Sequence, residues 1–155
     1  MTLEEKLKKL AEQKAAAESI DWNQQREKWL RAIGRLYTDI EHWLQPYVDK
    51  RLASTKRGAV QLSEDHIGRY SCPTLEINLS GQVLRLVPVA TLIIGAYGRI
   101  DVQRGPRPMK GEVLLTIEKS LDEPLWVLWT NGSTGEHKVF NKETMEEAIG
   151  KWIDS

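Results

Sequence analysis

Cysteine is almost missing from this chain of 155 residues, in which Cys72 is the single example. One cysteine cannot form an intrachain disulfide, and the even set of cysteines that marks a secreted disulfide framework is absent. A nucleophilic cysteine would also need a neighbouring base and an electropositive setting. The sequence around Cys72 shows neither, so we expect a buried structural thiol.

Net charge and long apolar runs are lacking as well. The 22 basic residues balance the 22 acidic ones, whereas nucleic-acid-binding domains are usually basic. The most apolar stretch, residues 86–97, is shorter than the roughly 20 residues of a membrane-spanning helix. The first residues do not show the basic and then apolar pattern of a signal peptide. We expect a cytoplasmic protein that does not contact a membrane.

Motifs for metal or cofactor chemistry are scarce. The 3 histidines, His42, His66 and His137, fall on different predicted elements. None has a second histidine, cysteine or carboxylate at metal-ligand spacing. The nearest polar cluster, Glu64 to His66, is typical of a solvated entry to a strand. We expect no metal site and no cofactor.

One short motif would fit an enzyme. Glu136 and Lys138 have the E-x-K spacing of metal-dependent nucleases, in which carboxylates hold Mg²⁺ and the lysine polarises the attacking water. Asp101 or Asp122 would supply the second carboxylate. A pattern of three residues is common by chance, and this one follows a predicted loop. A metal-dependent nuclease is therefore a distant alternative, and we lean against an enzyme.

The N-terminal segment, residues 1–20, is predicted to be a helical arm with a helix over 3–18. Its leucines Leu3, Leu7 and Leu10 recur at steps of four and three, which makes a narrow seam like that of a coiled coil. The seam fades at Lys14. Because so narrow a face cannot hold a solitary helix, we predict self-association with a second copy through these leucines.

The remainder, residues 21–155, reads as one domain. Asp21 is a good N-cap for a long tryptophan-rich helix over 21–45, and Pro46 predicts a break or kink at its end. The apolar stripe of this helix is broad enough to pack on a core. Asn141 is expected to cap a last helix over 142–153.

Between these helices, residues 58–140 read as a run of strands, after a polar linker over 49–58. In the clearest hairpin, 75–79 and 82–86 flank the loop Ser80-Gly81. That register pairs Leu75 with Leu86, Ile77 with Leu84 and Glu76 with Arg85. Further strands are predicted at 89–97 (covered on both faces), 99–103, 113–117, 125–130 and 138–140. Strands without intervening helices predict an antiparallel sheet of about five to seven strands and an α+β fold.

The 6 tryptophans are a high count for this length. Periodicity favours a core position for Trp29, Trp43 and Trp152. Trp126 and Trp129 share one predicted strand, and their odd spacing sends them to opposite faces. The outward one of this pair is a candidate for a protein interface, where tryptophan is enriched.

A basic segment is the candidate for polyanion binding. Arg99, Arg104, Arg107 and Lys110 lie within residues 99–110, where Asp101 is the single acid. Prolines stiffen this connection, and such a pattern suits phosphate contacts. A solvated hairpin loop would look the same. A second basic cluster could extend the patch if the fold brings the two together; it consists of Lys50, Arg51, Lys56 and Arg57.

These observations predict a non-enzymatic protein-interaction or regulatory module, homo-oligomeric through its N-terminal helix. Another protein is a plausible partner. The alternative is a nucleic-acid-associated protein that uses the basic loop, and the nuclease is the distant third.

Overall fold

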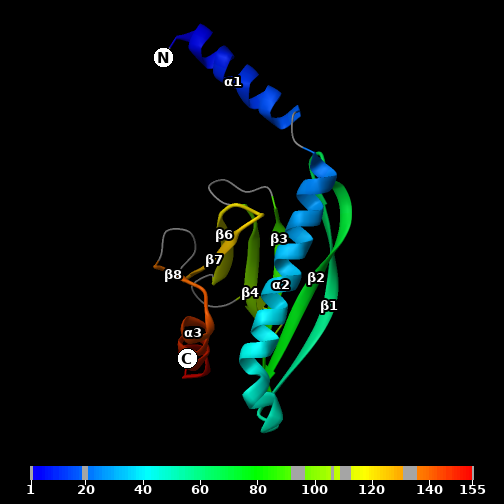
Figure 1. Ribbon diagram of the computed structural model, residues 1–155. Coiled ribbons are helices and arrows are strands. Elements are labelled where there is room, and N and C mark those ends of the chain that lie inside the picture. Colours follow the sequence, from blue (N-terminus) through cyan, green and yellow to red (C-terminus); the bar gives the residue numbers. More distant parts are fainter. Residues whose placement is uncertain are drawn as a thin grey trace.

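The computed structural model describes residues 2–18, 21–91, 97–105, 107–108, 113–130 and 136–154 (Figure 1). Two N-terminal helices, a run of strands and a C-terminal helix follow one another, so the predicted α+β fold is confirmed. The helices are α1 (Leu3–Glu18), α2 (Trp22–Asp49) and α3 (Lys142–Asp154). The strands are β1 (Ala53–Glu64), β2 (Gly68–Leu79), β3 (Gln82–Ala90), β4 (Arg99–Arg104), β5 (Arg107–Pro108), β6 (Leu114–Lys119), β7 (Pro124–Trp129) and β8 (His137–Val139).

The strands of the described residues form one antiparallel sheet. Its order is β1-β2-β3-β4-β6-β7-β8, and the short β5 pairs with β4 away from this path. The predicted register of the β2–β3 hairpin is confirmed, with Leu75 opposite Leu86, Glu76 opposite Arg85 and Ile77 opposite Leu84. At its turn Ser80 and Gly81 have φ values of 53° and 98°. Positive φ at both central residues is the requirement of a type I′ turn, whose twist matches that of the strands.

The sheet begins earlier than the sequence indicated. Residues 53–58, which we expected in a linker, form the first half of β1, and all twelve residues of β1 pair with β2. β1 is an edge strand with mostly exposed residues. Charged side chains such as those of Lys56 and Arg57 are well tolerated on an edge, so the apolar alternation that signals a strand is missing here.

The strand predicted over 89–97 is confirmed only at its start. Val89 and Ala90 end β3, and residues 92–96 lie outside the described part of the chain. Val89 is 41% exposed, so the expected cover on both faces is wrong at this position. The reason is its place at the end of the strand, where the register with β4 shifts between Pro88 and Ala90.

Helix α2 is the longest of the described helices. The carboxylate of Asp21 accepts a hydrogen bond from the Gln24 amide at 3.1 Å, which confirms the predicted N-cap. The helix does not end near Leu44 but continues through Pro46 to Asp49. Pro46 cannot donate the backbone hydrogen bond to the preceding turn, yet the helix continues for three more residues. The Tyr47 hydroxyl, which donates to Glu146 Oε1 at 2.9 Å, ties this last turn to α3.

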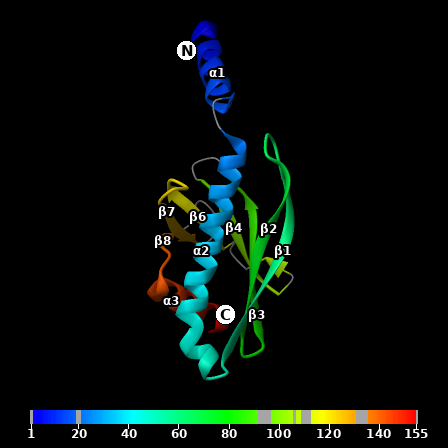
Figure 2. The same ribbon diagram turned by 45° about the vertical axis from the view of Figure 1, so that its right-hand side comes forward.

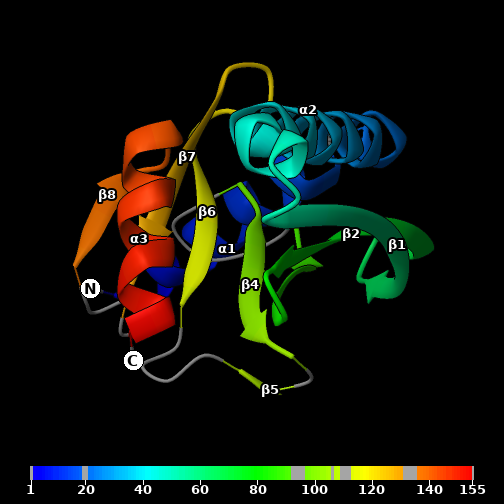
Figure 3. The ribbon, with the colours of Figure 1, turned by 90° about the horizontal axis from the view of Figure 1, so that it is seen from below.

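The core lies between one face of the sheet and the two helices α2 and α3 (Figure 3). Its fully buried side chains include Trp29, Ile33 and Ile40 of α2. Trp126 faces this core, with its ring 6.3 Å from that of Trp29. The last helix begins as predicted, because the Asn141 side chain accepts a hydrogen bond from the Thr144 amide at 3.0 Å.

Helix α1 stands apart from this arrangement. Figures 1 and 2 show it beyond the N-terminal end of α2, projecting away from the sheet and from α3. Within the described ranges, none of the helices has the length and apolar character needed to cross a membrane.

Candidate interaction surfaces

The leucine seam of α1 is exposed to solvent. Leu3, Leu7 and Leu10 are 72%, 55% and 60% exposed. The start of the helix is stabilised locally, since Thr2 and Glu5 exchange reciprocal hydrogen bonds of 3.2 Å in a capping box. Glu4 and Lys8 add an exposed ion pair at 3.5 Å. These local contacts favour the helix, but they leave its apolar face without cover.

A second apolar surface lies at the opposite end of the domain. There the end of α2, the start of β1, the β2–β3 turn and one face of α3 enclose a groove of about 430 Å³. We call it the α2–α3 groove. It is lined by Leu44, Tyr47, Leu52, Ala53, Leu79, Ser80, Gln82, Glu146, Ile149, Gly150 and Ile153.

The α2–α3 groove combines an apolar floor with one carboxylate. Leu44 and Ile149 are buried at its base, while Leu52 and Ile153 remain 50% and 44% exposed on its walls. The hydrogen bond to Glu146 raises the pKa of the Tyr47 hydroxyl above its ordinary value. Sequence reasoning missed this groove, because it assigned Leu52 to a linker and treated Ile153 as part of a core helix. The one local feature in the sequence that pointed to this groove was an apolar residue, Leu52, just after the charged residues 49–51.

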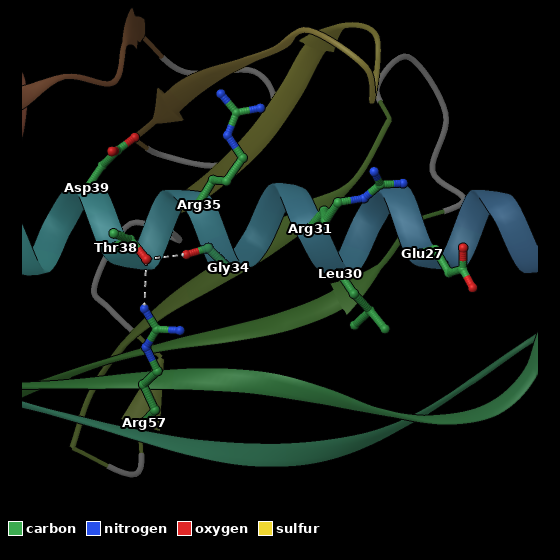
Figure 4. Close-up of a pocket in the computed structure, with 8 residues that line it drawn as sticks. All are labelled: Glu27, Leu30, Arg31, Gly34, Arg35, Thr38, Asp39 and Arg57. Carbon is green, nitrogen blue, oxygen red and sulfur yellow. Dashed lines mark hydrogen bonds between the residues drawn. The ribbon is translucent and has the colours of Figure 1, made fainter.

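The outer face of α2 carries a larger, open hollow of about 940 Å³ (Figure 4). Figure 4 shows Arg31 and Arg35 on one side of the helix and Arg57, from β1, on the other. Arg57 Nη2 donates to Thr38 Oγ1 at 3.1 Å and forms an ion pair with Glu41. Its guanidinium also lies 5.9 Å from the centre of the Tyr37 ring.

The charges of this hollow balance. Glu27 and Asp39 line it together with the arginines, and Glu41 neutralises Arg57. The contacts of Arg57 join the edge strand β1 to α2. We therefore interpret the hollow as a structural junction and not as an anion site.

The fold divides the predicted basic patch. Arg99 and Arg104 are five residues apart in β4 and so point to opposite faces of the strand. Arg99 Nε is 2.7 Å from Asp101 Oδ1, and Arg104 donates to Gln82 Oε1 at 2.5 Å. Arg104 and Arg107 are directly opposed across the β4–β5 hairpin. Lys110 lies outside the described residues.

The second basic cluster does not extend this patch. Lys56 and Arg57 lie on β1, three strands away from β4 in the sheet order. At about 4.8 Å per strand this separation is roughly 14 Å. Lys56 is directly opposite Glu76 in the β1–β2 register, so an acidic residue lies beside it.

Of the residues of the nuclease alternative, Glu136 and Lys138 line one small pocket of about 70 Å³ beside α3, but neither candidate aspartate lines it. Lys138 Nζ contacts Glu147 Oε1 at 3.2 Å, and with Lys151 it holds the pKa of the Glu147 carboxyl below its usual range. Asp101 is paired with Arg99, and Asp122 lies 3.0 Å from Lys28 Nζ. Among the residues that the structure describes, no three histidine, cysteine or acidic side chains are grouped to hold a metal ion.

Two other residues singled out in the sequence, Cys72 and Trp129, pack against other residues of the same chain. Cys72 is fully buried, and burial followed by the nearby Glu64 carboxylate raises the pKa of its thiol to about 12. Trp129 is the outward tryptophan of β7. Its ring stacks on His137 at 4.5 Å, and its Nε1 donates to Thr116 Oγ1 at 2.9 Å. Trp129 is therefore partly covered by its own chain.

Two further sequence candidates lie at the ends of α2. His66 stacks on Trp22 at 4.9 Å, which joins the tip of the β1–β2 hairpin to the start of the helix. Trp43 makes an edge contact with Phe140 at 5.8 Å. Trp43 and Trp152 are half-buried against the core, in agreement with the periodicity.

Comparisons of the chain with protein-family models, with curated proteins and with solved structures gave no match. The fold therefore defines the class, an α+β protein with a long helix and a C-terminal helix on one face of an antiparallel sheet. The exposed leucines of the α1 seam and the lining of the α2–α3 groove are two apolar surfaces of this fold.

Proposed function

We propose that this chain is a non-enzymatic interaction or regulatory module that associates with itself through α1. The observation that carries the proposal is the exposure of Leu3, Leu7 and Leu10 along one side of a projecting helix. Burying a leucine stabilises a complex by about 1.5–3 kcal/mol, so a partner surface for this seam has a substantial driving force. A helix whose sole role was to keep the protein in solution would not need leucines at these spacings.

The proposal is tested by light scattering on the full chain and on two double variants. Leu7→Ala with Leu10→Ala removes most of the seam and keeps helix propensity, since alanine is the best helix former. Lys9→Ala with Glu12→Ala changes two residues on the other side of α1 and leaves the net charge unchanged. We expect a dimer for the full chain and the control, and a halved mass for the leucine variant. A monomeric full chain would refute the proposal.

A second candidate function is binding of a polyanion by the β4–β5 hairpin. The observation in its favour is the direct opposition of Arg104 and Arg107, which places two basic residues side by side. Two such residues make a small electrostatic footprint on a chain with no net charge. This candidate therefore ranks below self-association.

A further inference from the structure

We propose that the leucine seam of α1 docks in the α2–α3 groove of a second copy, and that the second copy returns the same contact. This inference rests on the proposed self-association and names the surface that receives the seam. It distinguishes a groove-bound helix from a coiled coil of two α1 helices.

The groove suits an apolar helix face. Its walls come from three parts of the chain that are far apart in sequence, and most of its lining is apolar. Leu52 and Ile153 stand 50% and 44% exposed on opposite elements. A helix laid between them would cover both side chains while burying its own leucines. Amphipathic helices recognise grooves in this way, through anchors spaced three and four residues apart.

A coiled coil explains the seam less well. Coiled coils need apolar heptad positions sustained over about three or four heptads. The seam contains three leucines and ends before Lys14, which is about one and a half heptads. Two such helices would bury little, whereas a preformed groove supplies the missing apolar surface.

The charges of the two surfaces are complementary. Helix α1 as a whole carries four lysines and four glutamates, but its lysines gather in residues 6–14, where all four stand against Glu12 alone. Helix α3 contains four acidic residues and two basic ones, an excess of two negative charges. One of these acids, Glu146, lines the groove itself. The positive middle of α1 is therefore complementary to the acidic side of the groove, and complementary potentials guide a helix to its groove.

The groove of the same chain is out of reach. Leu44, at the near end of the groove, lies 22 residues beyond Trp22 along α2, which is about 33 Å at 1.5 Å per residue. Leu7, at the centre of the seam, lies 11 residues before Glu18, which is about 17 Å. Even a fully extended connection from Glu18 to Trp22, which is four residue steps, adds only about 14 Å. The centre of the seam therefore stops at about 31 Å, short of the near end of its own groove, so α1 cannot lay the seam along that groove and a second copy has to supply it.

In a two-fold symmetric dimer, both copies can make the contact between seam and groove. In Figure 1, α1 and the C-terminal end of α2, which lines the groove, lie at opposite ends of the molecule. Two copies placed side by side and antiparallel bring each α1 next to the groove of the other. Such an isologous pair is closed, so association stops at the dimer and does not continue into a fibre.

The first test fills the groove. Gly150 lies on α3 and lines the groove, and a β-carbon added there would meet no atom within 4 Å. Gly150→Arg should therefore leave the fold intact, obstruct the groove and repel the lysines of α1. Gly34→Arg is the matched control, because Gly34 also lies in a helix with open space around it, on the outer face of α2. We expect Gly150→Arg to be monomeric and Gly34→Arg to remain a dimer in light scattering.

The second test traps the contact by a disulfide. A chain with Leu7→Cys is mixed with a chain carrying Ile153→Cys under mild oxidation, and the buried Cys72 does not compete. We expect the mixed cross-link between positions 7 and 153, in preference to a link between two copies of the first variant. This test does not depend on how Gly150→Arg affects the fold.

The outcomes separate the two proposals. If Gly150→Arg stays dimeric, and position 7 links to position 7, the groove is not the receptor and self-association through α1 stands. If the unmodified chain is a monomer, both ideas fail. Loss of the dimer in Gly150→Arg together with the 7–153 cross-link establishes the groove as the partner of the seam.

Discussion

Gly98 lies against the indole of Trp29 so closely that a β-carbon on Gly98 would come within 2.2 Å of the ring carbon Cζ3. Gly98 precedes β4, and Trp29 is a fully buried residue in the N-terminal half of α2. The contact fixes how near the helix can approach this strand. Because the neighbour is a large ring inside the core, it cannot move aside without disturbing the packing around it.

We predict that Gly98→Ala destabilises the fold by about 1–3 kcal/mol, the usual cost of overpacking a core. The measurement is the urea midpoint of unfolding. Gly34→Ala is the control, because its new methyl group meets open space and should stabilise α2 by about 0.5–1 kcal/mol. Equal stability of the two variants would show that the indole has room to shift.

The hydroxyl of Tyr37 contacts backbone carbonyls of two neighbouring strands, β2 and β3. It donates to the Pro73 carbonyl at 2.9 Å and lies 3.4 Å from the Leu86 carbonyl, at the end of the β2–β3 pairing. We predict that Tyr37→Phe costs about 1–3 kcal/mol, because a buried carbonyl would lose its partner. Tyr97→Phe, at a tyrosine that is 45% exposed, should change stability by less than about 0.5 kcal/mol. Thermal unfolding of both variants measures the difference.

The buried thiol of Cys72 makes stability depend on alkaline pH. Burial, and then the Glu64 charge, raise the pKa of the thiol from 9.0 to about 12. The folded protein keeps this proton where the unfolded chain has lost it. Stability is therefore complete below about pH 9 and falls as the pH rises toward 12. The pKa values of Tyr37 and Tyr70 are raised too, mainly by burial, and act in the same direction.

We predict that Cys72→Ala weakens this dependence. Urea midpoints of the unmodified chain should fall between pH 8 and pH 10, and those of the variant should fall less, since only the tyrosines remain to titrate. Below about pH 9 the variant will be less stable because it leaves a small cavity, and the difference should shrink as the pH rises. The prediction fails if the two curves run parallel. A thiol reagent should label Cys72 only after unfolding, which provides an independent check.

Local patterns in the sequence were sufficient for the β2–β3 hairpin. The alternation around Leu75 and Leu86 and the Ser80-Gly81 turn are contained within a dozen residues, so the register could be predicted. The same holds for the N-caps Asp21 and Asn141. In each case the residues that determine the structure are neighbours in sequence.

The features that were not predicted from the sequence depend on contacts between residues that are far apart along the chain. β1 was partly assigned to a linker because its edge position, which tolerates Lys56 and Arg57, depends on the order of the whole sheet. Helix α2 continues past Pro46, and the next residue, Tyr47, contacts Glu146, 99 residues later. The α2–α3 groove joins Leu44, Leu79 and Ile153, whose proximity no short pattern reveals.

The basic candidate site shows the same limit. Four charges close together in sequence predicted one patch, but the alternation of β4 sends Arg99 and Arg104 to opposite faces. The pairing of Arg104 with Arg107 depends on the return of the chain in β5. The charges along the sequence do not distinguish Arg99, which pairs with Asp101, from Arg104 and Arg107, which are opposite each other in a hairpin.

The β4–β5 hairpin leads to the last prediction. If the chain binds a polyanion, we expect Arg104, Arg107 and Lys110 to make the contact, and Arg99, paired with Asp101, to contribute little. Each neutralised phosphate adds about −0.9 to the log–log dependence of affinity on salt, so two or three contacts give a slope of roughly −2 to −3. Affinity should be modest and show little sequence preference, because the zero net charge gives no long-range attraction.

The measurement is a titration of labelled duplex DNA and single-stranded RNA at two salt concentrations. The triple variant Arg104→Ala, Arg107→Ala and Lys110→Ala should abolish binding. A matched control removes three arginines elsewhere on the surface, Arg31→Ala, Arg35→Ala and Arg69→Ala, and so changes the net charge equally. If both triple variants lose affinity to the same degree, binding follows total charge and the hairpin is not a site. Binding that survives the hairpin variant but not the control would move the contact to the face that carries Arg31 and Arg35.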